Sequence, residues 1–191
     1  MNIKSISFIL ILSILVINAD AQASIANHVF IEPADKTVNL GETFSIILKG
    51  EDFNLGMDGG SIDMAFDPMI LNADSVSINS GFWNVDASKG SIDNDAGKID
   101  FTDVAQFGSN TTNTLFDIAT FTFHANGIGS SQLILKVNDN SPFATGGDVI
   151  AVNLSNGLII VQAIPLPAAI WLFATALIGL GVFSKRKESG K

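Results

Sequence analysis

The residue types that carry most enzymatic chemistry are scarce in this sequence. The 191 residues include two histidines, His28 and His124, and no Cys or Tyr. Without Cys, a disulfide framework, a thiolate zinc site and a cysteine nucleophile are excluded. Neither His lies in a G-x-S-x-G turn, an H-E-x-x-H pair or a metal-ligand spacing. His124 ends a predicted strand beside Ala125-Asn126-Gly127, so we expect it at a surface or edge position. A Ser-His-Asp site with distant members stays open, although no pattern points to one.

Carboxylates are abundant, and one of them has an unusual position. A glycosidase pair needs two carboxylates a few ångströms apart, which abundance alone does not predict. The alternation through Ile99 and Phe101 places Asp103 on the apolar face of a strand. A charge there is costly unless it is paired or lies at a β-bulge. We therefore expect a bulge or strand end at Asp103, with a buried polar network or a site as the alternative.

Two more segments have a possible ligand. The run Asp93-Asn94-Asp95-Ala96-Gly97 gathers oxygens, which hard cations prefer. It lacks the third acidic position, the following glycine and the distal Glu of an EF-hand loop, so we expect a turn between strands and no metal or cofactor. Trp83 would stack on a sugar ring if it were exposed, and we expect it to fill the core instead.

Short strands must position these residues. Between residues 24 and 162, Gly, Asn and Asp recur at intervals of about 8–12 residues, and apolar residues alternate with polar ones between them. Such a period of two over many short segments predicts an all-β sandwich. The favoured hairpin dipeptide Asn156-Gly157 is expected to divide the last strand. The predicted strands are 28–32, 36–40, 43–49, 61–66, 72–78, 97–104, 115–124, 131–137 and 149–161.

The N-terminal segment has the pattern of a secretory signal peptide. Lys4 precedes an apolar run over 8–17, and the small-x-small site Ala21-Gln22-Ala23 follows. We expect a signal peptide over 1–23 with cleavage after Ala23, Ala21 being the second choice. A buried N-terminal strand or helix is the alternative.

The C-terminal segment has the pattern of a membrane anchor. No charge occurs over 166–183, and Lys185, Arg186 and Lys187 follow at once. A helix over 166–183 is about 27 Å long, enough to cross the hydrocarbon core. The basic cluster is expected to stay in the cytoplasm and the body outside. A buried core helix is the alternative.

The charge distribution excludes one class of partner. The whole chain has a net charge of −9, but residues 24–162 contain five Lys, no Arg and 17 acidic residues, which leaves −12. Nucleic-acid binding needs clustered Lys and Arg, and is therefore not expected. Anionic polymers are disfavoured as ligands for the same reason.

The body resembles a cohesin domain in the order of its motifs. The residues that carry the resemblance are 36–44, 60–71 with its Asp67-Pro68-Met69-Ile70-Leu71 segment, 97–101, 115–123 and 129–131. The resemblance covers about residues 28–161. It implies a jelly-roll sandwich of about nine strands, shared with a group of cellulose-binding modules. In cohesins one face of the sandwich binds a calcium-loaded dockerin module, and in the related modules a face binds polysaccharide.

The tail resembles a PEP-CTERM sorting signal in its "VPLPA" form. Pro165, Leu166, Pro167 and Trp171 carry the resemblance, together with the apolar segment and the basic stop. The Glu of the Pro-Glu-Pro version is missing. The resemblance implies processing by an exosortase, a membrane protease-transpeptidase of Gram-negative bacteria that make extracellular polysaccharide. The prolines also disfavour a helix at the membrane edge, leaving extended backbone accessible. An ordinary anchor after a Pro-rich joint is the alternative.

Together these patterns predict three parts: a signal peptide (1–23), a cohesin-like sandwich (24–162) and a sorting tail (163–191). We expect a non-catalytic protein, anchored in the inner membrane before processing and then at the cell surface or in the extracellular matrix. Its expected partner is extracellular polysaccharide or a dockerin-like protein module. A glycan-active enzyme with paired carboxylates and a purely structural surface protein are the alternatives.

Overall fold

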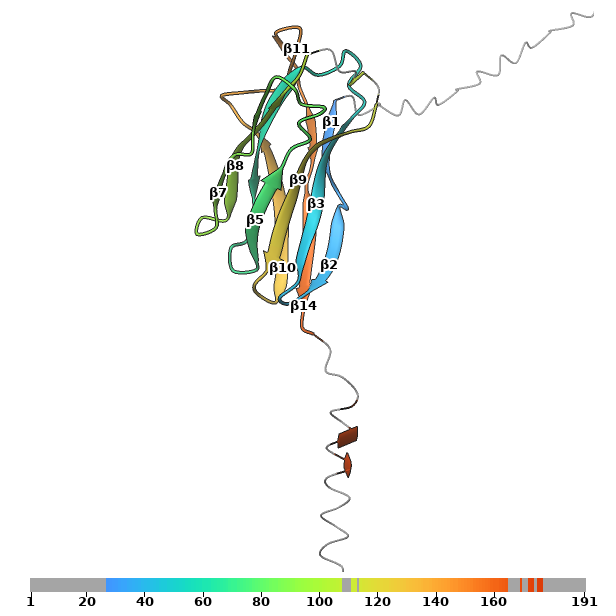
Figure 1. The fold of residues 1–191 in the computed structure, drawn as a ribbon, viewed down its shortest axis with the longest axis vertical. Helices are drawn as coiled ribbons and strands as arrows, with labels where there is room; N and C mark the ends of the chain where they lie inside the picture. The colour runs from blue at the N-terminus through green and yellow to red at the C-terminus, as the bar shows by residue number, and fades with distance from the viewer. Residues whose placement is uncertain are drawn as a thin grey trace, which may run out of the picture.

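The computed structural model describes residues 27–107, 111–112, 114–164, 169, 172–173 and 175–176. Residues 28–162 form two β-sheets that make a sandwich (Figure 1). The smaller sheet has the order β13-β1-β3-β9-β5. Its strands are β1 (His28–Glu32), β3 (Thr43–Glu51), β5 (Leu71–Ser77), β9 (Phe116–Ala125) and β13 (Asn153–Ser155).

The larger sheet contains nine short strands. Its main path has the order β12-β11-β4-β10-β14-β2, β8 pairs with β4, and β6 and β7 both pair with β8. Its strands are β2 (Asp35–Asn39), β4 (Gly59–Ala65), β6 (Asp86–Ser88), β7 (Ser91–Asp93), β8 (Lys98–Ala105), β10 (Gly129–Val137), β11 (Ala144–Thr145), β12 (Asp148–Val149) and β14 (Gly157–Gln162).

The first and last parts of the body each contribute to both sheets. β1 and β13 pair in parallel in the smaller sheet, and β2 and β14 pair in parallel in the larger one. The chain changes sheets at Asn156, whose Oδ1 accepts a hydrogen bond from the Leu135 amide at 2.9 Å. The predicted division at this position is confirmed. The hairpin was wrong, because β13 and β14 lie in different sheets and do not pair with each other.

The core lies between the two sheets and follows the predicted alternation. On β3, Phe44, Ile46 and Leu48 are buried, as the period of two predicts. The largest fully buried side chains include Trp83, Phe53, Phe121, Phe123 and Phe143. Aromatic side chains of this size bury enough apolar surface for a stable core without disulfides.

Three strands, β6, β7 and β11, lie outside the nine predicted segments. Each has two or three residues, too few to show a period of two in the sequence. The strands that were predicted differ from the observed bounds mainly by one or two residues at an end, apart from the last one, which is divided among three short strands.

The two ends of the chain fall largely outside the described residues. The predicted signal-cleavage residue Ala23 lies there, as do Pro165, Leu166, Pro167, Trp171, Lys185, Arg186 and Lys187. In the part that the structure describes, no helix is both long enough and apolar enough to cross a membrane.

Candidate functional site

The outer face of the smaller sheet is polar, and its side chains bond to one another. Ser45 and Thr122 form a hydrogen bond of 3.1 Å across β3 and β9. The Lys49 Nζ lies 2.9 Å from Glu32 and 3.1 Å from Asp117. The hydrogen bond to Glu32, followed by that to Asp117, raises the pKa of Lys49. This face therefore has most of its polar groups already paired within the sheet.

Three side chains on this face have the connectivity of a serine-hydrolase triad. The His28 Nδ1 lies 2.9 Å from the Glu51 Oε1, and its Nε2 lies 2.7 Å from the Ser155 Oγ. A carboxylate–imidazole–hydroxyl chain is the arrangement that activates a serine nucleophile. The sequence did not point to it, because the three residues lie on β1, β3 and β13. Acyl transfer also needs a substrate pocket and donors for the oxyanion. Ser155 is exposed on a sheet face and does not line the pocket described below, so we regard the trio as a cross-strand network.

The outer face of the larger sheet differs, because apolar side chains stand exposed among charged ones. We call this surface, formed by the outward side chains of β8, β4, β10 and β14, the mixed face. Phe101, Ile134 and Ile160 are 37%, 47% and 42% exposed there. Lys98 and Asp100 form an ion pair of 2.6 Å beside them. Exposed apolar groups with a charged surround are typical of protein interaction surfaces.

A β-bulge turns Phe101 onto the mixed face. Phe101 has a φ of 62°, and the pairing of β4 with β8 shifts between Ile62 and Met64. The Asp63 Oδ1 accepts a hydrogen bond of 2.8 Å from the Phe101 amide. The predicted bulge is present, but it lies at Asp100-Phe101 and not at Asp103, which pairs regularly with Ser61. The predictions that Phe101 and Asp103 share the buried face of Ile99 were wrong, because the bulge reverses the alternation. Such backbone strain costs about 1–3 kcal/mol and clusters at functional sites.

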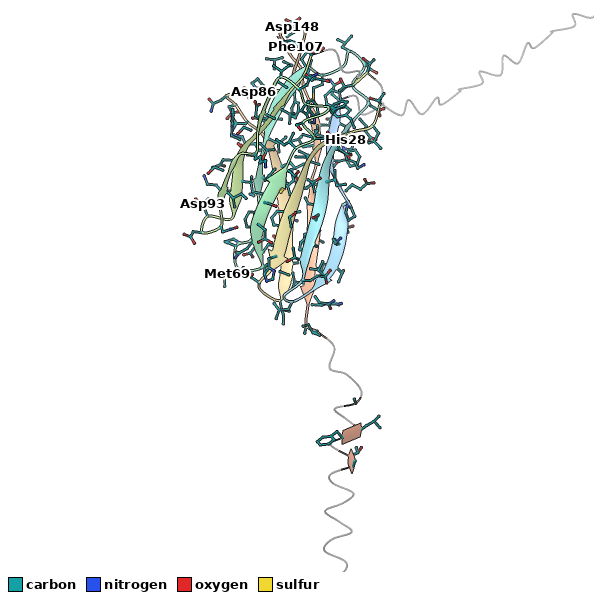
Figure 2. All side chains as sticks on the ribbon, viewed as in Figure 1. His28, Met69, Asp86, Asp93, Phe107 and Asp148 are labelled. Carbon is teal, nitrogen blue, oxygen red and sulfur yellow. The ribbon has the colours of Figure 1, made fainter. Side chains whose placement is uncertain are left out.

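A pocket of about 240 Å³ lies where β8 meets the loop before β11. Asp103 lines it and accepts a 2.7 Å hydrogen bond from the Ser141 Oγ. Burial raises the pKa of Asp103, and the nearby Asp86 carboxylate raises it further, whereas the Ser141 hydrogen bond acts in the opposite direction. Asp86 and Phe107 lie at the same end of the sandwich (Figure 2).

The segment Asp93–Gly97 is a turn. The Asp93 Oδ1 accepts a 2.9 Å hydrogen bond from the Ala96 amide. Asn94 bonds to both backbone groups of Ala73, at 2.8 Å to the amide and 3.1 Å to the carbonyl. Its amide therefore fastens the turn to β5. Within the ranges that the structure covers, no group of three or more His, Asp and Glu is placed to hold a metal ion.

Trp83 and His124 have structural surroundings. Trp83 is 2% exposed, and its indole Nε1 donates a 3.0 Å hydrogen bond to the Asp117 carbonyl. It therefore fills the core, as expected, and is not a sugar-stacking residue. The His124 Nδ1 lies 3.1 Å from the Thr43 Oγ1 near the end of β9.

Comparisons with known proteins identify the fold. No family model matches the sequence, and no curated protein matches it. Solved cohesin structures do match. The third cohesin of ScaC from Acetivibrio cellulolyticus, in complex with the ScaB dockerin, has a TM-score of 0.57 and 20% identity over 72% of this chain and 99% of that one. A type I cohesin of OlpC from Clostridium thermocellum, also in a dockerin complex, has a TM-score of 0.57 and 15% identity over 74% and 96%.

A type III cohesin module agrees with these two. It comes from ScaE, a cell-surface anchoring scaffoldin of Ruminococcus flavefaciens, and has a TM-score of 0.55 and 13% identity over 76% of this chain and 93% of that one. At these identities the likeness establishes the fold. The chain contains a domain with the cohesin fold, and the predicted all-β sandwich is confirmed.

Proposed function

We propose that this protein is a non-catalytic, exported binding module that holds a dockerin-like protein partner on its mixed face. The observation that carries the proposal is Phe101, which a strained bulge turns outward in the middle of a sheet. Two of the similar cohesin structures were solved in complex with dockerins. A fold alone does not fix a function, so the choice of face rests on the side chains of this chain.

The two outer faces of the sandwich differ in what they offer a partner. On the smaller sheet, side chains such as Ser45, Lys49 and Thr122 are bonded to neighbours in the same sheet. On the mixed face, Phe101 and Ile134 expose apolar surface that gains free energy when a partner covers it. Interfaces are enriched in such aromatic and apolar anchors at their centre. The mixed face therefore fits a protein partner better.

Polysaccharide binding is the alternative outcome of the experiment. Sugar binding uses exposed aromatic rings as stacking platforms. Trp83 is buried and supplies none, so the exposed rings of Phe101 and Phe107 would have to serve.

The test combines capture of proteins from the extracellular matrix with a glycan array. The wild-type chain is expected to capture a protein, and Ile134→Lys is expected to abolish capture by placing a charge in the apolar centre. Ser77→Lys is the matched control, because Ser77 is exposed on the opposite sheet. Loss of capture in the control but not in Ile134→Lys would place the partner on the other face. Glycan binding without protein capture would contradict the proposal.

The sorting part of the proposal concerns the two ends. Residues 1–23 act as a signal peptide, and residues 163–191 hold the chain in the inner membrane until an exosortase processes them at the Pro165-Leu166-Pro167 segment. The support is the sequence pattern and the end of β14 at Gln162, directly before the proposed tail. The processed protein then belongs to the cell surface or extracellular matrix of a Gram-negative bacterium.

A further inference from the structure

The pocket beside Asp103 lies at the loop end of the larger sheet, next to the mixed face. We call it the acidic pocket. Its polar walls are Asp58, Asp103 and Gln106, and its apolar walls include Val85, Phe107 and Pro142. At about 240 Å³ it is large enough for a side chain and too large for a bare ion.

The carboxylates in this pocket are hydrogen-bond acceptors with capacity to spare. The Asp103 carboxylate accepts a 2.7 Å hydrogen bond from the Ser141 Oγ, and the Asp58 carboxylate accepts one from the Gly146 amide. An ionised carboxylate has about four lone-pair sites, so both groups can accept further donors. The Gln106 side chain turns inward, where its Nε2 donates to the buried Met57 carbonyl at 2.7 Å.

The surroundings of the pocket favour a positive charge. Asp86 lies close enough to Asp103 to disfavour its ionised form. No Lys or Arg is among the residues that line the pocket as described. The domain as a whole has an excess of acidic residues, with 17 against five Lys over residues 24–162. A cationic group would relieve this repulsion and pair with the carboxylates.

The rim is suited to the stem of a long basic side chain. Phe107 is 77% exposed and Val85 is 47% exposed at the pocket mouth. Arg and Lys bury their methylene stems against apolar surface, and their cationic heads are attracted to aromatic faces. The guanidinium carries five donors and no acceptor, which matches the carboxylate oxygens of Asp58 and Asp103.

We propose that the acidic pocket receives an arginine side chain of the protein partner, with Asp103 as its charge partner and the Asp58 carboxylate as a further acceptor. This inference rests on the proposed function, because it names a chemical feature of the partner. The arginine would anchor the partner at the loop end while the mixed face covers its apolar surface.

The test uses the full-length chain in detergent and the probe N-acetyl-arginine methylamide, followed by NMR of the backbone amides. We expect concentration-dependent shifts at Asp103, Gln106 and Phe107. The citrulline analogue keeps the shape of the probe but has no charge, and is expected to produce no shifts. Asp103→Asn should weaken binding about tenfold or more, because it removes the charge while keeping the contact to Ser141.

Two further variants test whether binding of the arginine probe depends on the acidic pocket. Asp74→Asn removes an exposed carboxylate on β5 and should bind the probe as the wild type does. Phe107→Ala removes an exposed ring and should weaken binding several-fold without affecting the fold. Equal binding of the arginine and citrulline probes, or unchanged binding by Asp103→Asn, would overturn the inference. Binding of a neutral oligosaccharide that depends on Asp103 would also overturn it, in favour of a sugar subsite.

The two proposals can fail separately. Protein capture that is lost in Ile134→Lys but unchanged in Asp103→Asn would leave the proposed function intact and refute the arginine anchor. Binding of the arginine probe without capture of any protein would support the pocket as a cation site and refute the proposed function.

Discussion

Asp103 retains its proton to a higher pH than an exposed aspartate does, because burial and the Asp86 carboxylate raise its pKa above the ordinary 3.8. Ionisation of Asp103 therefore opposes folding. Its unfavourable contribution is absent below pH 3.8 and fully present once the pH has risen through the raised pKa. We expect Asp103→Asn to remove this loss of stability over that range.

The measurement is chemical denaturation of both proteins at a series of pH values from below 3.8 upward. Asp86→Asn and Asp58→Asn serve as comparisons, since the Asp86 carboxylate acts on Asp103 electrostatically and Asp58 lines the same pocket. If the free energy of unfolding of the wild type and of Asp103→Asn depended on pH in the same way, the destabilising effect of Asp103 ionisation would be contradicted.

The trio Glu51–His28–Ser155 gives a second prediction at the residue scale. If it is a cross-strand network, Ser155→Ala removes one partly exposed hydrogen bond and changes the free energy of unfolding by about 0.5–1.5 kcal/mol. We also expect the wild-type protein to be inert to a fluorophosphonate probe. Labelling of Ser155 that disappears in His28→Gln would show that the trio activates a nucleophile.

The turn after β7 gives a prediction at the scale of the element. Asn94 bonds to both backbone groups of Ala73, so Asn94→Ala should lower the free energy of unfolding by about 1–3 kcal/mol. Asp95→Ala, an exposed neighbour, is the control. EDTA should leave the melting temperature unchanged. A large decrease in EDTA would mean that the turn binds a cation that stabilises the fold.

The bulge on β8 should show opposite effects on stability and binding. Phe101 holds a φ of 62°, which costs a residue with a side chain about 1–2 kcal/mol and costs glycine little. Phe101→Gly should therefore match or exceed the wild type in stability, although it should lose capture of the partner. Denaturation and the matrix capture assay measure the two effects. Full capture by this variant would remove Phe101 from the interface.

The elements were predictable where the chain repeats a simple pattern. Phe44, Ile46 and Leu48 recur at every second position, with Ser45 and Lys49 on the opposite face, and this spacing places them in the core. Phe101 was misplaced because a bulge reverses the alternation, and the sequence does not show which residue will bulge. The acidic pocket joins loop and strand residues far apart in sequence, as Asp58, Gln106 and Ser141 illustrate. The alternation of apolar and polar residues along the sequence does not show which distant segments will lie side by side.

At the scale of the whole molecule, the tail should act as a processing signal. The conjunction of Pro165 and Pro167 with a short apolar span and a basic stop motivates the prediction. Replacing both prolines with Ala should extend the helix, hide the scissile backbone and leave a full-length protein in the membrane. Mass spectrometry of the mature protein in its native host decides this. If the mature wild-type protein still ended at Lys191, processing would be refuted and the tail would act only as a membrane anchor.

The placement of β14 has a mechanical consequence. This strand lies between β10 and β2, bonded to both, and ends at Gln162 at the end of the sandwich opposite β11 (Figure 1). Ladder hydrogen bonds run across the strands, so tension applied through the chain beyond Gln162 loads both ladders of β14 in shear. They must then break together and not one at a time, which slows forced unfolding. If the chain beyond Gln162 were attached to a surface and a partner were bound at the opposite end of the sandwich, a pulling force between the two would not detach β14 from its sheet readily.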